Sequence, residues 1–327
     1  MSPKRKQALC VAAAIVAIAF AGAAGAEELK TWRHGLLEAK SDAGFTMMAG
    51  LRGFAQNRGL KLDLLQVKSE PTALKALIAG ELDSYEGGPG SGMVAAARGA
   101  DIRIVACAWP GFVHGVFAGP KIARIEDIRG KAFATSAPGS LPDLLARAVL
   151  EQYRVPAAEV RFANIGSDND RYKALDAGVV DAAILSAEFT PVAEHGIRLL
   201  LAGRDAMPNF IRGCFMTTAA VLAARRDDAV RFVAAEIEAL RYAVAHRAEI
   251  AALTREVTKA KADDPRPEFI FDEAVRHRDV DPEAPLPLDK LAWMQEQLVH
   301  AGNIPAPVDL NKIVDPDVRA KAHDLIK

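Results

Sequence analysis

A seven-residue pattern, L-x-A-G-x-x-D, occurs twice in this chain, at residues 77–83 and 175–181, and constrains its fold more than any other feature. In each copy the leucine and alanine end a helical pattern, the glycine provides a left-handed cap, and the aspartate begins a short apolar run that predicts a strand. L-x-A-G alone is a common junction between a helix and a strand. Because the whole pattern recurs, we expect two βα lobes of similar construction.

Short apolar runs alternate with helical patterns between residues 29 and 202, which is typical of repeated βα units and a mostly parallel sheet. The predicted strands cover residues 29–34, 60–67, 81–85, 102–108, 131–136, 160–165, 181–186 and 197–202. After Arg225 the composition changes to Ala-, Arg- and Glu-rich helical segments. The predicted class is therefore α/β with a helical C-terminal segment.

The N-terminus has the layout of a secretory signal peptide. Basic residues at positions 4–6 precede an apolar run at 9–20, and small residues at 24–26 follow it. A bilayer span needs about 20 apolar residues, so cleavage near Ala26 is favoured over a membrane anchor. Cys10 precedes most of the apolar run, which argues against a lipoprotein. We expect residues 1–26 to be removed from an exported protein.

Charge and cysteine content restrict the partners. The formal net charge of −1 argues against nucleic acids and anionic membranes as partners. Cys107 and Cys214 are the cysteines that remain after cleavage. We interpret them as buried free thiols, and the alternative is a single disulfide in an oxidising compartment.

Ligands of open α/β sheets bind beyond the carboxyl ends of the strands. This rule selects the loops at residues 34–45, 84–91, 109–114, 136–143 and 186–190. In the fourth loop, small residues at 136–140 precede a helix whose free amide groups and dipole would favour an anion, although Ser140 could simply cap that helix. Among the aromatic residues, Trp109 is favoured because Pro110 and Gly111 interrupt the strand beside it.

The motifs of catalysis are missing from the sequence. The glycine-rich segment 87–92 lacks the Lys-Ser/Thr of a phosphate loop, and there is no G-x-S-x-G, H-E-x-x-H or C-x-x-C. Of the histidines, only His34 and His114 lie at predicted cleft edges. We therefore predict no enzymatic activity, no metal site and no cofactor.

Six segments, taken in order, resemble type II periplasmic solute-binding proteins of ABC importers. They are residues 74–83, 95–99, 102–106, 125–131, 136–140 and 181–186. The resemblance is closest to the branch that binds alkanesulfonates, taurine, nitrate and thiamine pyrimidine precursors. It implies a hinged fold of that type, with lobe 1 at 27–110, lobe 2 at 111–215, and a return to lobe 1 with C-terminal helices at 216–327. The crossings between lobes would lie near 109–114 and 213–218.

The resemblance also implies a set of ligand-binding residues, to which we add Trp109. The implied residues are Ser41, Asp42, Glu86, Gly87, Ser136, Gly139, Ser140 and Glu188. Glu86 and Glu188 would repel a simple sulfonate. The alternatives for the ligand therefore include a compound with an amine or aminopyrimidine donor, and a carboxylic acid held by other groups.

The implied function is that of a monomeric periplasmic protein that captures a sulfonate, carboxylate or pyrimidine-like solute by hinge closure. Its partners would be that solute and an ABC permease with a cytoplasmic ATPase. The alternatives are an enzyme on the same scaffold that acts on a pyrimidine or aromatic acid, and a ligand-sensing receptor subunit.

Overall fold

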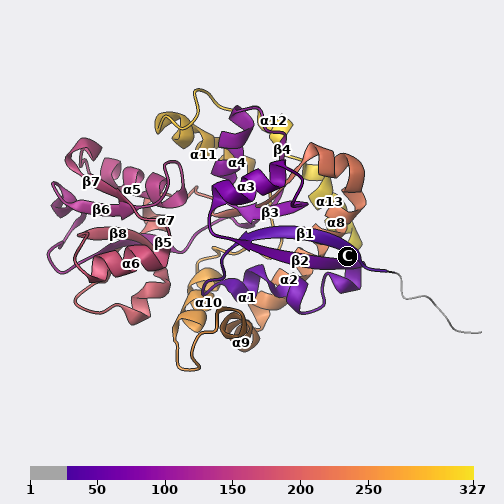
Figure 1. Cartoon of the computed structure of the whole chain (residues 1–327), viewed down its shortest axis with the longest axis horizontal. Helices are drawn as coiled ribbons and strands as arrows, with labels where there is room; N and C mark the ends of the chain where they lie inside the picture. Colours follow the sequence, from indigo (N-terminus) through magenta and orange to yellow (C-terminus); the bar gives the residue numbers. More distant parts are fainter. Residues whose placement is uncertain (1–27) are drawn as a thin grey trace, which may run out of the picture.

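The computed structural model describes residues 28–327, so the predicted signal peptide lies outside the described residues. Two five-stranded sheets, each with helices packed on it, form two lobes (Figure 1). The strand order is β2-β1-β3-β10-β4 in the first sheet and β7-β6-β8-β5-β9 in the second. The predicted two-lobed α/β fold is confirmed.

The strands divide evenly between the lobes. The first sheet contains β1 (Lys30–Leu37), β2 (Leu60–Val67), β3 (Ser84–Gly87), β4 (Ile102–Trp109) and β10 (Gly213–Thr218). The second contains β5 (His114–Ala118), β6 (Ala132–Thr135), β7 (Arg161–Asn164), β8 (Ala182–Ser186) and β9 (Arg198–Ala202).

The helices are divided unevenly. The first lobe carries α1 (Ala43–Thr46), α2 (Met48–Leu51), α3 (Glu70–Ile78), α4 (Pro89–Ala97) and the C-terminal helices α8 (Ala219–Ala245), α9 (Arg247–Thr258), α10 (Arg266–Arg276), α11 (Leu288–His300), α12 (Leu310–Ile313) and α13 (Pro316–Leu325). The second carries α5 (Leu141–Gln152), α6 (Asp168–Asp176) and α7 (Gly203–Ala206). Short 3-10 helices are η1 (Gln56–Arg58), η2 (Ile125–Ile128), η3 (Ala157–Glu159) and η4 (Ala187–Val192).

One strand in each sheet is reversed. β10 pairs antiparallel with β3 and β4, and β5 pairs antiparallel with β8 and β9, while the other pairs are parallel. Four of the five strands in each sheet therefore run in one direction, as expected of a mostly parallel sheet, and the reversed strand is the exception. Both reversed strands enter their sheet directly from a crossing, so neither has the preceding helix by which a βα unit is recognised in a sequence.

The repeated sequence pattern has the same structural role in both lobes. Asp83 Oδ2 accepts the amide N–H of Arg33 in β1 at 2.8 Å, and Asp181 Oδ2 accepts that of Ala132 in β6 at 2.9 Å. The preceding glycines have left-handed backbones, with φ of 76° at Gly80 and 67° at Gly178. Each copy thus ends a helix and ties the next strand to the neighbouring parallel strand, β1 in the first lobe and β6 in the second.

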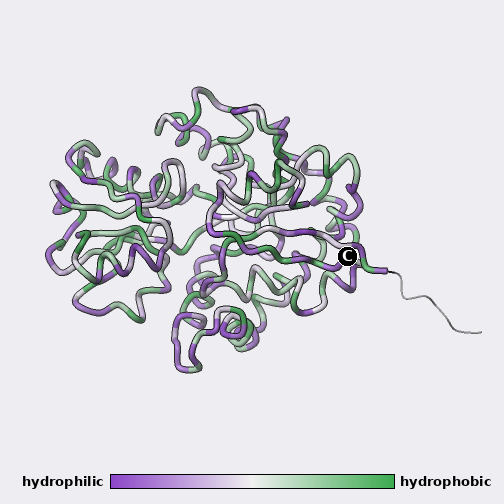
Figure 2. Tube along the Cα trace, in the orientation of Figure 1, coloured by the Kyte–Doolittle hydropathy of each residue, from purple (hydrophilic) through white to green (hydrophobic). Residues whose placement is uncertain are grey.

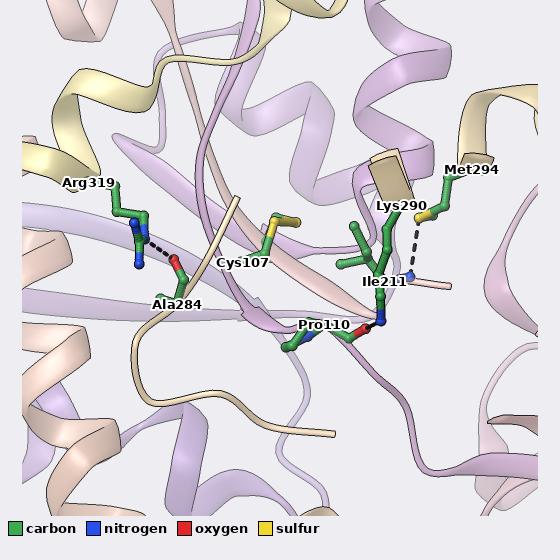
Figure 3. The surroundings of a disulfide bond; sticks show 8 residues. Cys107, Pro110, Ile211, Ala284, Lys290, Met294 and Arg319 are labelled. Atoms are coloured by element: carbon green, nitrogen blue, oxygen red, sulfur yellow. Dashed lines mark hydrogen bonds between the residues drawn. A yellow bond between two sulfur atoms is a disulfide. The ribbon is translucent and has the colours of Figure 1, made fainter. Parts of the chain in front are cut away.

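Helix α11 contacts both crossings between the sheets. The chain leaves the first sheet after β4 and returns to it at β10. Lys290 Nζ donates to the carbonyl of Pro110 at 2.9 Å, in the first crossing (Figure 3). It also donates to the carbonyl of Pro208 at 3.3 Å, in the second crossing. The amide of Ile211 also donates to Met294 Sδ at 3.3 Å. The lobe boundaries at 110 and 215 stay a prediction.

Cys107 and Cys214 form a disulfide between β4 and β10 (Figure 3). Our interpretation of these residues as free thiols is therefore wrong. The two cysteines are 107 residues apart in sequence, and only the antiparallel pairing of β10 with β4 brings them together. The disulfide that stood as the alternative is the one formed, and it was not favoured because no strand was predicted at residues 213–218.

Hydrophobic residues line much of the second sheet and also run through the interior of the first lobe (Figure 2). In the first lobe the rings of Trp32 in β1 and Phe232 in α8 stack with centroids 5.5 Å apart, so the longest helix is fastened to the sheet. None of the helices between residues 28 and 327 is long and apolar enough to span a bilayer.

Candidate functional site

A network of charged side chains joins the two lobes, beyond the carboxyl ends of parallel strands in both sheets. Lys40, which follows β1, places its Nζ 2.5 Å from Oδ2 of Asp168, the first residue of α6. The amide of Ser41 donates to Oε2 of Glu188 in η4 at 3.1 Å. The first partner in each contact belongs to lobe 1 and the second to lobe 2. The site therefore lies where the rule for α/β sheets predicts a ligand.

Arg212, in the second crossing, anchors the lobe 1 side of the network. Its guanidinium forms an ion pair with Asp42, the residue before α1. The same guanidinium lies 4.3 Å from the ring centroid of Trp109, an arrangement that favours a cation–π interaction. Within the described chain, Arg212 Nη1 is buried and has no hydrogen-bond partner.

Asp168 is the centre of the lobe 2 side. Its Oδ1 accepts Nη2 of the buried Arg171 at 2.6 Å and the amide of Ser186 at 3.2 Å. Burial alone would raise the pKa of Asp168, but Lys40 and Arg171 outweigh it and hold the pKa well below its usual range. Asp168 is therefore a fixed negative charge.

Three further carboxylates lack a cationic partner. Burial raises the pKa of Glu86 to about 7, although the charge of Arg212 opposes that shift. Burial also raises the pKa of Glu188 and of Glu70. No ion pair involving Glu70, Glu86 or Glu188 occurs among residues 28–327.

The helix N-termini at the site are already occupied by carboxylates of the protein. At α4, Glu70 accepts the amide of Gly88 at 3.2 Å and the hydroxyl of Ser91 at 2.7 Å. At α5, Asp143 accepts the amide of Gly139 at 2.9 Å. The segment 136–140, which was expected to attract an anion, therefore carries one of its own.

Two buried polar groups complete the site. His114 is buried, and its Nε2 lies 3.9 Å from Asp168 Oδ1. Burial lowers the pKa of His114 to about 3, so the ring is neutral. Within residues 28–327, neither His114 Nδ1 nor the Tyr85 hydroxyl has a hydrogen-bond partner. Because unpaired buried polar atoms are unfavourable, these atoms are candidates for contact with a solute.

The predicted ligand-binding residues fall into two groups. Those that the structure brings to the network are Ser41, Asp42, Glu86, Trp109 and Glu188. Gly87 ends β3, where an added Cβ would collide with the Tyr85 hydroxyl. The ligand-binding roles stay a prediction.

The second group lies at the start of α5, where Ser136 follows β6. Gly139 lies against the side chain of Asn303 in the C-terminal segment. Ser140 occupies the N-cap position, but its hydroxyl makes no capping hydrogen bond. Within the described residues, none of these three residues takes part in the ion pairs of the network, and Gly139 lies instead beside the C-terminal segment.

The sequence analysis missed three central residues of the network, Lys40, Asp168 and Arg212. Asp168 was detectable, because it follows β7 and the rule that selected the other loops selects residues 165–168 as well. Arg212 precedes β10, which was not predicted. His34, expected at a cleft edge, is instead buried beside Phe232, with ring centroids 4.8 Å apart.

Two further features bear on the assignment. Among residues 28–327, no group of His, Cys, Asp and Glu side chains has an arrangement that could hold a metal ion. A groove of about 530 Å³ between α5 and α11 is lined mainly by apolar side chains, including Leu144, Phe210 and Met294. None of the network residues lines this groove, so we place the candidate site at the network.

Comparisons with known proteins agree on the fold. The alkanesulfonate-binding protein SsuA from Xanthomonas axonopodis pv. citri, bound to MOPS, matches with a TM-score of 0.72 and 18% identity over 88% of this chain and 99% of its own. The nitrate-binding protein NrtA from Synechocystis PCC 6803 matches with a TM-score of 0.74 and 15% identity over 92% and 90%. The desulfurization enzyme DSZB matches with a TM-score of 0.70 and 16% identity over 91% and 100%.

These three likenesses show a fold that binding proteins and an enzyme share. No curated protein matches the chain. Residues 41–250, which are more than half of the chain and include the network apart from Lys40, match the family model described as NMT1/THI5 like. The chain belongs to the NMT1/THI5-like family.

Proposed function

We propose that this protein is the solute-binding component of an ABC-type importer. It captures a small organic solute between its lobes in the periplasm, as a monomer, and delivers it to a membrane permease driven by a cytoplasmic ATPase. Support comes from the family, from the two-lobed fold, and from the likeness to SsuA and NrtA, which are named as binding proteins. Sulfonates, carboxylates and pyrimidine-like compounds are the candidate solutes.

The observation that carries the proposal is the pair of contacts between lobes, Lys40 with Asp168 and Ser41 with Glu188. Polar groups of both lobes converge there, and several are buried. A solute that touches both lobes stabilises the closed arrangement, because an open arrangement offers it only one set of contacts. This is the behaviour that capture and release require.

A thermal-shift screen over sulfonates, nitrate, aromatic carboxylates and aminopyrimidines tests the proposal. A solute at 100 times its dissociation constant stabilises the folded state by about 2.7 kcal/mol. Glu188→Ala should weaken any hit about tenfold or more, whereas Glu194→Ala, at an exposed position of the same segment, should not change it. Failure of every class to stabilise the protein, or equal affinity in both variants, would contradict the proposed site.

Import and sensing differ in the partner that responds. If the protein serves import, its solute-loaded form should stimulate ATP hydrolysis by the cognate permease complex reconstituted in vesicles. A loaded protein that leaves the ATPase unchanged would argue for a sensing role.

An enzyme on this scaffold is the second candidate, because Glu86 is a buried acid whose pKa is raised to about 7, a value suited to proton transfer near neutral pH. Mass spectrometry of each hit after incubation with the protein tests it. Conversion by the wild type but not by Glu86→Gln would establish an enzyme, and unchanged hits would support a binding protein.

A further inference from the structure

We infer that the solute of this site is a small organic cation with N–H donors, such as a protonated amine, amidine or guanidine, and not an anion. This inference rests on the proposed function, because it names the solute class of the same site. Three independent features of the network lead to it.

The first feature is the balance of charge. Five carboxyl groups stand with three cations. Burial raises the pKa of Glu70, Glu86 and Glu188, and a cation bound beside them would favour their ionised forms. The carboxylates are Asp42, Glu70, Glu86, Asp168 and Glu188, and the cations are Lys40, Arg171 and Arg212. Arg266, whose charge also reaches Glu188, is paired with Asp264 and adds no net charge. An incoming anion would meet like charges in a region from which water is largely excluded.

The second feature is that every cation of the network already has a carboxylate partner. Lys40 and Arg171 both contact Asp168, and Arg212 contacts Asp42. Binding a sulfonate or nitrate through Lys40 or Arg171 would take that cation from Asp168, and in the described chain Arg212 has only its Nη1 free beside the pair with Asp42. Breaking a buried ion pair in this way is strongly unfavourable.

The third feature is the set of helix N-termini, the other common anion sites of α/β proteins. The carboxylate of Glu70 occupies the N-terminus of α4, and that of Asp143 occupies the amide of Gly139 before α5. One backbone amide at each of these helix starts is therefore already bound to a carboxylate of the protein, which would repel an incoming anion.

Groups that can accept hydrogen bonds are more abundant than free donors. Glu188 accepts one backbone amide, and its carboxylate has further lone pairs. The Tyr85 hydroxyl and His114 Nδ1, both buried and unpaired in the described chain, can also accept. The Tyr85 hydroxyl can donate as well as accept, and Arg212 Nη1, which also lacks a partner there, can only donate. A fitting solute therefore carries several N–H donors and one acceptor, such as a hydroxyl or carbonyl oxygen.

Matched pairs of probes that share a skeleton test the inference by isothermal titration calorimetry. We expect benzamidine to bind more tightly than benzoate and benzenesulfonate, and agmatine and propylamine to bind more tightly than propanesulfonate, by about tenfold or more. If the anions bind as tightly or more tightly, or if none of the cations binds, the inference is wrong. An anion that binds and responds to Glu188→Ala would overturn the inference but leave the proposed importer function intact.

Variants that remove a charge show whether the preference for cations comes from electrostatic attraction or from the shape of the site. Glu188→Gln keeps the size of the side chain and should weaken the tightest cation about tenfold, while it narrows the preference for cation over anion. Glu194→Gln is the matched control and should change neither affinity. Circular dichroism checks that each variant is folded. If Glu188→Gln weakens the cation and the anion equally, the preference does not come from charge.

Discussion

The two lobes share a strand topology but differ in the contacts that stabilise them. In both lobes the aspartate that ends the repeated pattern accepts an amide of the neighbouring parallel strand, β1 or β6. Only Asp83 also binds arginine side chains, with Arg33 Nη2 at 2.9 Å and Arg225 Nη1 at 3.0 Å. The first lobe further carries the disulfide and the C-terminal helices, and the described chain has neither in the second lobe. The repeat therefore sets the strand order in both lobes. Additional stability comes from contacts in the first lobe alone, the lobe that the chain leaves after β4 and re-enters at β10.

The largest expected effect is loss of the disulfide. In the chain-entropy model, a cross-link that spans about 100 residues stabilises a protein by about 5 kcal/mol. The double variant Cys107→Ala with Cys214→Ala should lower the free energy of unfolding by about this amount, measured by urea denaturation. Reduction of the disulfide in the wild-type protein should lower the free energy of unfolding by a similar amount. A change below about 1 kcal/mol would show that the first lobe does not depend on this link.

Arg171 tests the second lobe, which has no such link within the described residues. Arg171→Met removes the partner of the buried Asp168 and the donor to the Ile184 carbonyl, so a loss of about 3 kcal/mol is expected. Arg129→Met, which breaks the exposed pair with Glu159 in the same lobe, should cost less than about 1 kcal/mol. Equal losses in urea denaturation would refute the assignment of Asp168 and Arg171 as the buried centre of this lobe.

The two repeated aspartates allow a direct comparison. Asp83→Asn should destabilise the protein by about 2 kcal/mol, because it leaves Arg33 and Arg225 without their carboxylate partner. Asp181→Asn keeps an acceptor for the amide of Ala132 and should cost about 1 kcal/mol. Denaturation of both variants under one set of conditions gives the difference. The reverse order would mean that the arginines contribute no stability through Asp83.

The smallest effects concern the two capping glycines. Gly80→Ala and Gly178→Ala each force a side chain into a left-handed backbone, and no neighbouring atom lies close to the added carbon. Both should therefore cost about 1 kcal/mol, from the backbone alone. Gly166→Ala is a control at a position that is equally open but not left-handed, and it should be nearly neutral. Unequal costs at Gly80 and Gly178 would break the equivalence of the two copies.

Local patterns in the sequence sufficed for the class, the two lobes, most strands and part of the site. The L-x-A-G-x-x-D copies and the βα alternation are short-range signals, and a strand end with a polar residue such as Glu86 or Glu188 is visible without any knowledge of its neighbours. These features could be predicted because helix caps and strand periods depend on residues a few positions apart.

Other features were decided by tertiary contacts. The reversed strands β5 and β10 are recognised only by their pairing, and that pairing joins Cys107 to Cys214. Lys40 and Asp168 are 128 residues apart in sequence, yet they form the closest contact between the lobes that we describe. The charge balance of the site follows from such pairs, because a sequence gives the charges but not which of them neutralise one another. That is a matter of side-chain direction and distance, which arise only when the two lobes meet.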